Sequence, residues 1–261
     1  MTRRGESRVH SSVRRNRTSW DRDSAGYDRK FAKVLGGPSA MAWGLWRIPE
    51  AELGLLGPVR GKSVLELGCG AARWSAALAR RGARMTALDL SIAQLRQAQA
   101  IQREERRGFP LVRAAAESLP FQSRAFDLIF SDWGALTFAD PLRAVPECAR
   151  VLRPGGHLVF AASSPFRYLT HDRRRDRQSL RLRRDYFGLH RLEFGSRSPV
   201  EYTLPYDGWF DLFVRSGLAV ERLLETRPPR GARSSYLARS DDAFARRWPI
   251  ECLWRLRRLR A

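Results

Sequence analysis

The 261-residue chain contains no apolar run near the roughly 20 residues that a bilayer-spanning helix needs, and we therefore expect no membrane partner. Residues 1–17 are basic and polar, without the apolar segment of a secretory signal. The three cysteines, Cys69, Cys148 and Cys252, are odd in number and lack the spacing of a metal site. These features predict a cytoplasmic protein without disulfides and without a bound metal.

Lysine is scarce as well, because it accounts for only three of the 48 basic residues. The formal net charge is +21, and arginine supplies nearly all of the positive charge. Most of the excess lies in three segments, residues 1–19, 173–184 and 246–260. Such clusters occur on phosphate-binding surfaces, but no RNA-recognition aromatic signature, zinc knuckle or helix-turn-helix pattern accompanies them. We interpret them as a basic tail and solvated arginines. Weak, non-specific nucleic-acid binding at low salt is the expected consequence.

The central part of the chain carries a strand, a glycine turn and a helix in succession. An apolar run at 64–67 is followed by Gly68 and Gly70, then by an alanine-rich helical stretch and a second strand that ends in Asp89. The glycines allow a sharp turn and a close approach of the backbone to a ligand. The Asp89 carboxylate can accept hydrogen bonds from two ribose hydroxyls. The pattern predicts a site for an adenosine-containing ligand.

The residues around this turn favour one such ligand. A dinucleotide fingerprint needs a third glycine, and Arg73 stands at that position. A Walker A loop is absent, because no Gly-Lys-Ser/Thr follows. Glu66, two residues before the first glycine, suits an ammonium group better than a phosphate. S-adenosylmethionine carries that ammonium and no phosphate, so it is favoured over NAD or FAD.

Short apolar runs alternate with helical patterns along the chain, which predicts an α/β fold with a doubly wound, mostly parallel sheet. Ser91 and Asp140, which precede helical patterns, are suited to cap the N-termini of two helices. The predicted strands are 64–67, 85–88, 111–114, 126–130, 218–226 and 250–257.

Four motifs follow one another in order along the chain, at 64–72, 117–121, 125–131 and 151–160. With these motifs the chain resembles the class I S-adenosylmethionine-dependent methyltransferases, of the type 11-like group. The resemblance implies a Rossmann-like seven-stranded sheet with an N-terminal helical cap, S-adenosyl-L-methionine as the cofactor, and methyl transfer as the activity.

The resemblance also implies cofactor-binding roles for individual residues. Gly68 and Gly70 would form the turn beneath the methionine portion, with Glu66 directed at its ammonium group. Asp89 would bind the ribose hydroxyls, and Leu90 would pack beside the adenine. The other implied contacts are Tyr27 over the methionine end, Ala116 and Glu117 at the adenine, and Ser131 near the sulfonium.

Two of these roles have alternatives. Ordinary packing would explain Tyr27 as well as a ligand contact does. Ala115 stands where many relatives have an aspartate that binds the adenine amino group. Glu117 or the backbone would have to substitute for it.

The predicted organisation is a disordered basic leader followed by a single methyltransferase domain. The leader is 1–18 and the domain is 19–261, divided into a helical cap at 19–57, a cofactor-binding core at 58–164, an acceptor-side insertion at 165–210 and C-terminal strands at 211–261.

Methyl transfer depends mainly on positioning, so no catalytic residue is assigned, although His171, His190 and Asp132 are candidate bases. Residues 131–134 differ from the motif that holds a planar nitrogen in amino-group methyltransferases, and no Pro-Cys nucleophile pair is present. These absences favour a small organic acceptor. An RNA methyltransferase that uses the basic segments and a noncatalytic S-adenosylmethionine-binding protein are the alternatives. The acceptor, the methylated atom and the oligomeric state are not predicted.

Overall fold

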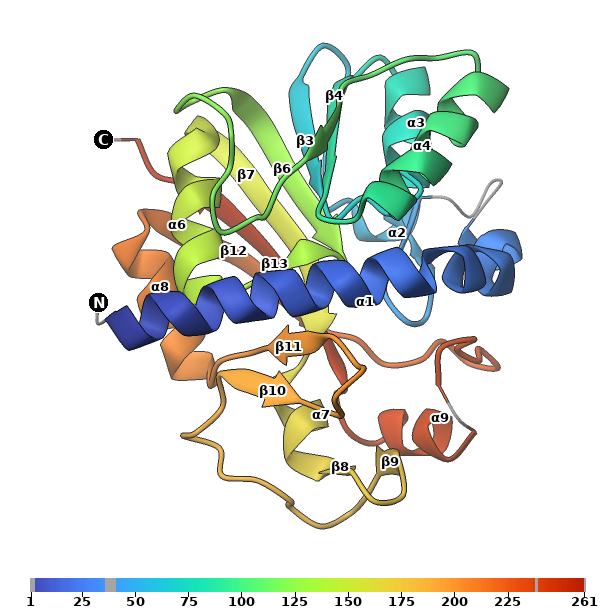
Figure 1. Ribbon diagram of the computed structural model, residues 1–261, viewed down its shortest axis with the longest axis vertical. Helices are drawn as coiled ribbons and strands as arrows, with labels where there is room; N and C mark the ends of the chain where they lie inside the picture. Colours follow the sequence, from blue (N-terminus) through green and yellow to red (C-terminus); the bar gives the residue numbers. More distant parts are fainter. Residues whose placement is uncertain (1–2, 36–40, 238, 261) are drawn as a thin grey trace.

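The computed structural model describes residues 3–35, 41–237 and 239–260, and within the first helix it describes the side chains of residues 10–26 and 30. A seven-stranded sheet forms the centre of the described chain (Figure 1). Its strands are β3 (Ser63–Leu67), β4 (Arg84–Asp89), β5 (Leu111–Arg113), β6 (Phe126–Asp132), β7 (Leu152–Ser163), β12 (Leu218–Glu225) and β13 (Glu251–Arg258).

The strand order is β12-β13-β7-β6-β3-β4-β5. β3 to β7 pair in parallel, whereas β13 runs antiparallel to both β7 and β12. The expected doubly wound, mostly parallel sheet is thereby confirmed. The chain builds outward from β3 to β5 and then returns to the other side of β3 with β6. Ligands of such sheets bind at this switch, beyond the carboxyl ends of the strands.

Helices cover both faces of the sheet. The side chains of β3 point alternately to the two faces, and their contacts show which helices cover each face. Leu65 and Leu67 pack into a cluster with residues of α6 (Pro141–Val151) and α8 (Tyr206–Arg215). Val64 packs on the opposite face against Trp74 and Leu78 of α3 (Arg73–Arg80). Because strand side chains alternate between faces, Glu66 lies on the α3 side.

Two helices begin at the capping residues expected from the sequence. The Ser91 hydroxyl accepts the Gln94 N–H at the start of α4 (Ile92–Glu104). The Asp140 carboxylate accepts the Leu142 N–H at the start of α6. Each cap supplies an acceptor for an N–H that has no partner within its own helix.

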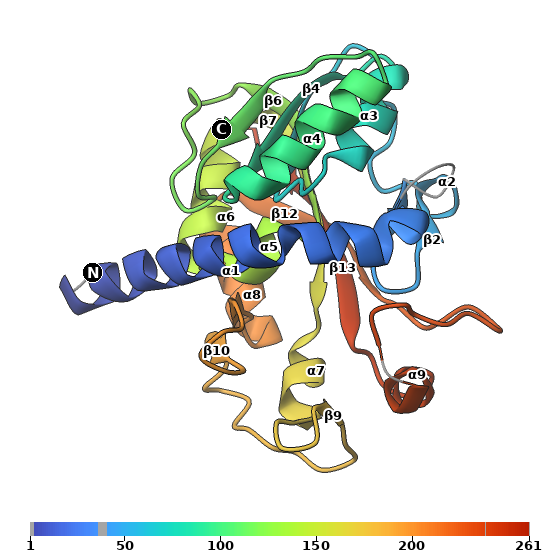
Figure 2. The same cartoon turned by 45° about the vertical axis from the view of Figure 1, so that its right-hand side comes forward.

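The expected disordered leader at 1–18 is wrong, because residues 3–35 form one long helix, α1 (Arg3–Leu35). Figures 1 and 2 both show α1 crossing the molecule between the sheet and the later insertion. Polar contacts with distant segments hold it, including two hydrogen bonds between the Asn16 amide and the backbone of Val200. A helix on its own is only marginally stable in water, so tertiary contacts are needed to hold it. The residues that make these contacts with α1 lie far away in the sequence.

The segment from α7 (Pro165–Thr170) to β11 (Val200–Tyr202) forms a small lobe on the other side of α1 from α3 and α4 (Figure 1), whereas α8, which follows it, packs on the sheet. The two C-terminal strands expected at 218–226 and 250–257 are confirmed as β12 and β13. Among the described residues, none of the helices combines the length and apolar character needed to cross a bilayer. The lobe and its surroundings also contain β8 (His171–Asp172), β9 (Arg177–Gln178), β10 (Arg191–Glu193) and α9 (Arg239–Ala245).

Candidate active site

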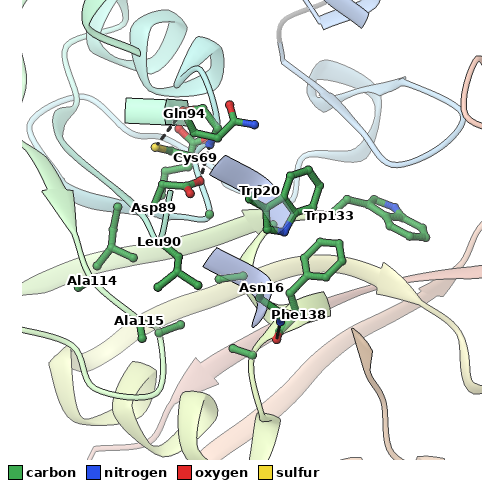
Figure 3. A pocket seen from close by; sticks show the side chains of 18 of the residues that line it. Asn16, Trp20, Cys69, Asp89, Leu90, Gln94, Ala114, Ala115, Trp133 and Phe138 are labelled. Atoms are coloured by element: carbon green, nitrogen blue, oxygen red, sulfur yellow. Dashed lines mark hydrogen bonds between the residues drawn. The ribbon is translucent and has the colours of Figure 1, made fainter. Parts of the chain in front are cut away.

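A cavity lies at the carboxyl ends of β3 and β4, where the fold predicts a ligand (Figure 3). The loops after β3 and β6 form its floor, and α1 covers it. Its lining includes Val13, Asn16, Trp20, Glu66, Gly68, Gly70, Arg73, Asp89, Leu90, Gln94, Ala114, Ala115, Ala116, Glu117, Asp132, Trp133, Gly134 and Phe138.

The floor is built from two interlocked loops. Gly68 has φ +71°, and a Cβ atom there would lie 2.3 Å from the Ala135 backbone nitrogen. A Cβ at Gly134 would likewise lie 2.4 Å from the Leu67 carbonyl oxygen. Gly68 is therefore required by the contact between these loops, whether or not a ligand is bound.

Ser131 takes part in this packing, and it is not among the residues that line the cavity, although the two residues after it are. Its side chain is fully buried, and its hydroxyl donates to the Leu67 carbonyl at 2.8 Å. Asp132 and Trp133, the next two residues, line the cavity.

Asp89 stands at the end of β4 with its carboxylate held from both sides. One oxygen accepts the Gly70 N–H at 2.9 Å and the other accepts the Ser91 N–H at 2.8 Å. Burial raises the pKa of Asp89 to about 6, against these hydrogen bonds. The carboxylate is thus fixed in orientation, and each of its oxygens can accept a further hydrogen bond.

Glu66 caps the helix that follows its own strand. Its carboxyl group accepts the Ser75 N–H at 3.0 Å and a bond from the Ser75 hydroxyl. Ala72, which precedes α3, has no side chain that could make such a cap. Burial raises the pKa of Glu66 to about 8. Glu66 therefore positions α3 while presenting a protonatable group to the cavity.

The charged groups of the cavity favour a cationic ligand. Four carboxyl groups line it, namely those of Glu66, Asp89, Glu117 and Asp132, whereas Arg73 is the one cation among the described lining residues. Burial raises the pKa of each of the four. A bound ammonium or sulfonium group would stabilise the ionised form of these carboxyl groups, whereas a pyrophosphate would be repelled by each one that is ionised.

One wall of the cavity is mostly apolar. Leu90 and the alanines at 114–116 form this wall (Figure 3). Glu117 also lines it, and its carboxylate accepts the Asp140 N–H at 3.1 Å. The family resemblance implies that adenine would lie at this wall, with Glu117 as a polar neighbour in place of the aspartate that Ala115 replaces.

The cover over the cavity was predicted only in part, because Asn16 lies in the segment 1–18 that was expected to be disordered, whereas Trp20 lies in the expected helical cap at 19–57. Asn16 and Trp20 of α1 face the cavity (Figure 3). The Asn16 amide donates to the Phe138 carbonyl at 2.8 Å, and the Trp20 ring meets the Phe138 ring edge-on at 5.1 Å between centroids. The i, i+4 spacing of Ser12, Asn16 and Trp20 is the one signal of a buried helix face in this segment.

The wall after β6 is braced by a second polar cluster. Trp133 has φ +50°, and its indole N–H donates to buried Glu251 at 2.5 Å. Asp132 accepts the Gly44 N–H at 2.8 Å and lies 3.5 Å from the Arg47 guanidinium. Burial raises the pKa of Glu251 to about 7. These bonds fix two side chains on the wall opposite Asp89.

Neither candidate histidine lines the cavity. His190 lies 2.9 Å from the Asp140 carboxylate, and His171 lies in the small lobe, 3.4 Å from Asp176. Asp132 does line it. The Tyr27 side chain lies outside the described residues. Within the described ranges, no group of three or more His, Cys, Asp and Glu side chains is placed to hold a metal ion.

Comparisons with known proteins show what the central part of the chain is similar to. Residues 65–160 match the model of a methyltransferase domain. The chain is 33% identical over 146 residues to a demethylmenaquinone methyltransferase of Clavibacter sepedonicus, covering 56% of each protein. It is 37% identical over 111 residues to a malonyl-acyl-carrier-protein O-methyltransferase of Salmonella typhimurium, covering 42% of this chain and 43% of that protein. The chain thus spans about half the length of the curated relatives it matches.

Solved structures extend the likeness beyond the core. An S-adenosylmethionine dependent methyltransferase from Mesorhizobium loti superposes with a TM-score of 0.66 and 26% identity, over 80% of this chain and 96% of that one. The cyclase SpnF superposes with a TM-score of 0.63 at 17% identity, over 94% and 95%. This second likeness is one of fold, and it shows that the fold alone does not fix the reaction.

Proposed function

We propose, from the premise that the chain carries a class I S-adenosylmethionine-dependent methyltransferase domain, that it transfers the methyl group of S-adenosylmethionine to a small organic acceptor. The observation that carries the proposal is the cavity's excess of buried carboxyl groups, beside an apolar wall and a fixed Asp89. This combination fits a nucleoside with a cationic end. It disfavours a dinucleotide, whose pyrophosphate would meet several carboxylates.

Four of the described residues would hold the cofactor. Asp89 would accept hydrogen bonds from the ribose, Glu66 would face the ammonium group, and Leu90 and Ala116 would pack against the adenine. Once bound, the cofactor supplies a methyl group already activated by a positively charged sulfur. The protein's remaining task is to align an acceptor and to exclude water, and alignment of this kind contributes roughly 7–11 kcal/mol.

The aromatic side chains opposite Asp89 would receive the acceptor. Trp20, Trp133 and Phe138 line that part of the cavity, and α1 shields it from water. Asp132 is the candidate general base on this wall, but its two carboxylate oxygens already interact with the Gly44 N–H and the Arg47 guanidinium. We therefore expect an acceptor group that is ionised, or that ionises readily, because such a group needs to be positioned but does not need a general base.

Titration calorimetry with S-adenosylmethionine and then with NAD tests the cofactor. Asp89→Ala should weaken S-adenosylmethionine binding by roughly 1–3 kcal/mol, through loss of a charged hydrogen-bond partner. The matched control is Asp211→Asn, an aspartate on α8 whose side chain is 76% exposed and far from the cavity lining. Tight NAD binding without a response to S-adenosylmethionine would overturn the proposal.

Transfer itself is tested with methyl-labelled cofactor and a panel of acceptors. Because relatives are named for demethylmenaquinone and malonyl-acyl-carrier protein, reduced quinones and acyl carboxylates are the first compounds to include. Label should appear in an organic product and depend on Asp89. Cofactor binding with no labelled product from this panel or from cell extract would indicate a noncatalytic binding protein.

A further inference from the structure

The segment at 172–187, here called the arginine loop, is the most strongly charged exposed surface that the mechanism leaves unused. It contains seven arginines and three aspartates, a net charge of +4. It spans β9 and the turns around it, at the far end of the small lobe (Figures 1 and 2). Its arginines line one shallow hollow: Arg173, Arg174, Arg175, Arg177, Arg181, Arg183 and Arg184.

Arginines of the other two basic segments are used to hold the fold together. Arg255 and Arg257 of β13 donate to Glu221 on the neighbouring strand at 3.0 and 2.7 Å. Arg15 of α1 pairs with Glu193 at 2.6 Å. The expectation that the basic segments are solvated faces is therefore wrong for these side chains.

The arginine loop differs in this respect. Arg183 pairs with Asp172 at 2.8 Å, and Asp172 also accepts backbone N–H groups of the loop. In the described part of the chain, the exposed guanidinium groups of Arg173, Arg174 and Arg175 form no ion pair. Their charge is available to an outside partner.

Apolar side chains stand among these arginines. Leu180, Leu182 and Phe187 are 75%, 69% and 86% exposed, far more than a folded chain needs to leave in water. A nucleic acid or a free polyphosphate would use the charge but give no burial to leucine side chains. A bilayer surface uses both, because lipid phosphates meet the arginines while the boundary with the acyl chains receives leucine and phenylalanine.

We propose that the arginine loop docks the protein on the surface of an anionic lipid bilayer. The expectation of no membrane partner was based on the lack of a spanning segment, and docking of this kind needs none. α7 joins the loop to the carboxyl end of β7, so the docked face belongs to the end of the sheet where the cavity lies. The proposal goes beyond methyl transfer and does not depend on it.

Co-sedimentation of the full chain with lipid vesicles tests the charge. The protein should bind vesicles of phosphatidylcholine with phosphatidylglycerol, bind pure phosphatidylcholine far more weakly, and dissociate as salt is raised. The triple variant R173Q/R174Q/R175Q should lose on the order of 100-fold in affinity, since each arginine near an anionic surface contributes about fivefold. The matched control R96Q/R103Q/R106Q removes three exposed arginines of α4 and the turn after it, and should bind as the parent does.

The apolar residues separate a bilayer from other anionic partners. L180S/L182S/F187S should weaken vesicle binding at least tenfold, whereas V214S, at a valine 72% exposed on α8, should not. Thermal melting checks that each variant is folded. Vesicle binding unaffected by the apolar substitutions would overturn the proposal, as would an RNA oligonucleotide that binds more tightly than the vesicles. Release from vesicles by equimolar pyrophosphate would also overturn it, in favour of a free-phosphate site.

Discussion

Replacing Glu66 with glutamine tests whether a buried carboxyl group faces the cationic end of the cofactor. Burial raises the pKa of Glu66 to about 8, so the group is mostly protonated at pH 7. A cation beside it favours the ionised form, which links binding to proton release. The ionised fraction of the free protein is about 3% at pH 6.5 and about 75% at pH 8.5. If the ionised form binds, wild-type affinity should tighten by up to about 25-fold over this range.

Titration calorimetry of wild type and Glu66→Gln at pH 6.5, 7.5 and 8.5 provides the measurement. The α-amino group of the ligand also titrates near pH 8, but it affects both proteins equally, so the ratio of the two Kd values is the readout. The Kd of Glu66→Gln divided by the Kd of wild type should rise with pH. Calorimetry in two buffers of different ionisation enthalpy should reveal proton release when wild type binds the cofactor. Glu104→Gln, at an exposed position on α4, should leave affinity unchanged. A ratio that is constant with pH would refute the role of Glu66.

The same substitution has a signature in stability. A raised carboxyl pKa means that the folded protein binds the proton more tightly than the unfolded chain, so the free energy of unfolding falls as pH rises from about 4.5 to about 8. Glutamine stays neutral throughout. Between pH 5.5 and 8.5 the variant should therefore gain up to roughly 3 kcal/mol relative to wild type. Urea denaturation at the two values measures this gain, and parallel behaviour of the two proteins would contradict it.

Three further substitutions test the cover and the floor of the cavity. Asn16→Ala removes hydrogen bonds to Phe138 and Val200, and should speed amide exchange in residues 10–24 while weakening cofactor binding. Trp20→Ala should raise the Kd for S-adenosylmethionine with little loss of thermal stability, and an unchanged Kd would remove Trp20 from the site. Gly68→Ala places a Cβ 2.3 Å from the Ala135 nitrogen at φ +71°, and should lower the melting temperature sharply even without ligand.

The core of the fold could be predicted because its signals are local. The apolar strands, the caps Ser91 and Asp140, and the carboxylate of Asp89 at the end of a strand all follow from short stretches of sequence. Their meeting at one edge follows from parallel pairing. The sequence predicts that Glu66 faces a ligand, but no local pattern indicates that it also caps α3, because that bond depends on how the helix packs on the strand.

The errors have the opposite origin. Residues 1–18 look like a disordered tail because they hold few apolar side chains. Within the described part of this segment, Ser12 and Asn16 are held by polar contacts with residues nearly two hundred positions away, such as Tyr202 to Ser12. Ser131 belongs to a strand that the sequence predicts, but its hydrogen bond to the Leu67 carbonyl depends on how β6 and β3 meet. Neither fact is encoded in neighbouring residues.

Helix α1 contacts both the cavity and the insertion. Asp21 of this helix accepts the Ser91 hydroxyl at 2.6 Å, two residues after Asp89, while Asn16 bonds to Val200 of the insertion. A movement of α1 that opens the cofactor cavity must therefore break contacts with the insertion as well. Because both sets of contacts involve one rigid helix, cofactor exchange and rearrangement of the insertion should occur together. Closure over the cofactor would then also complete the wall that receives the acceptor.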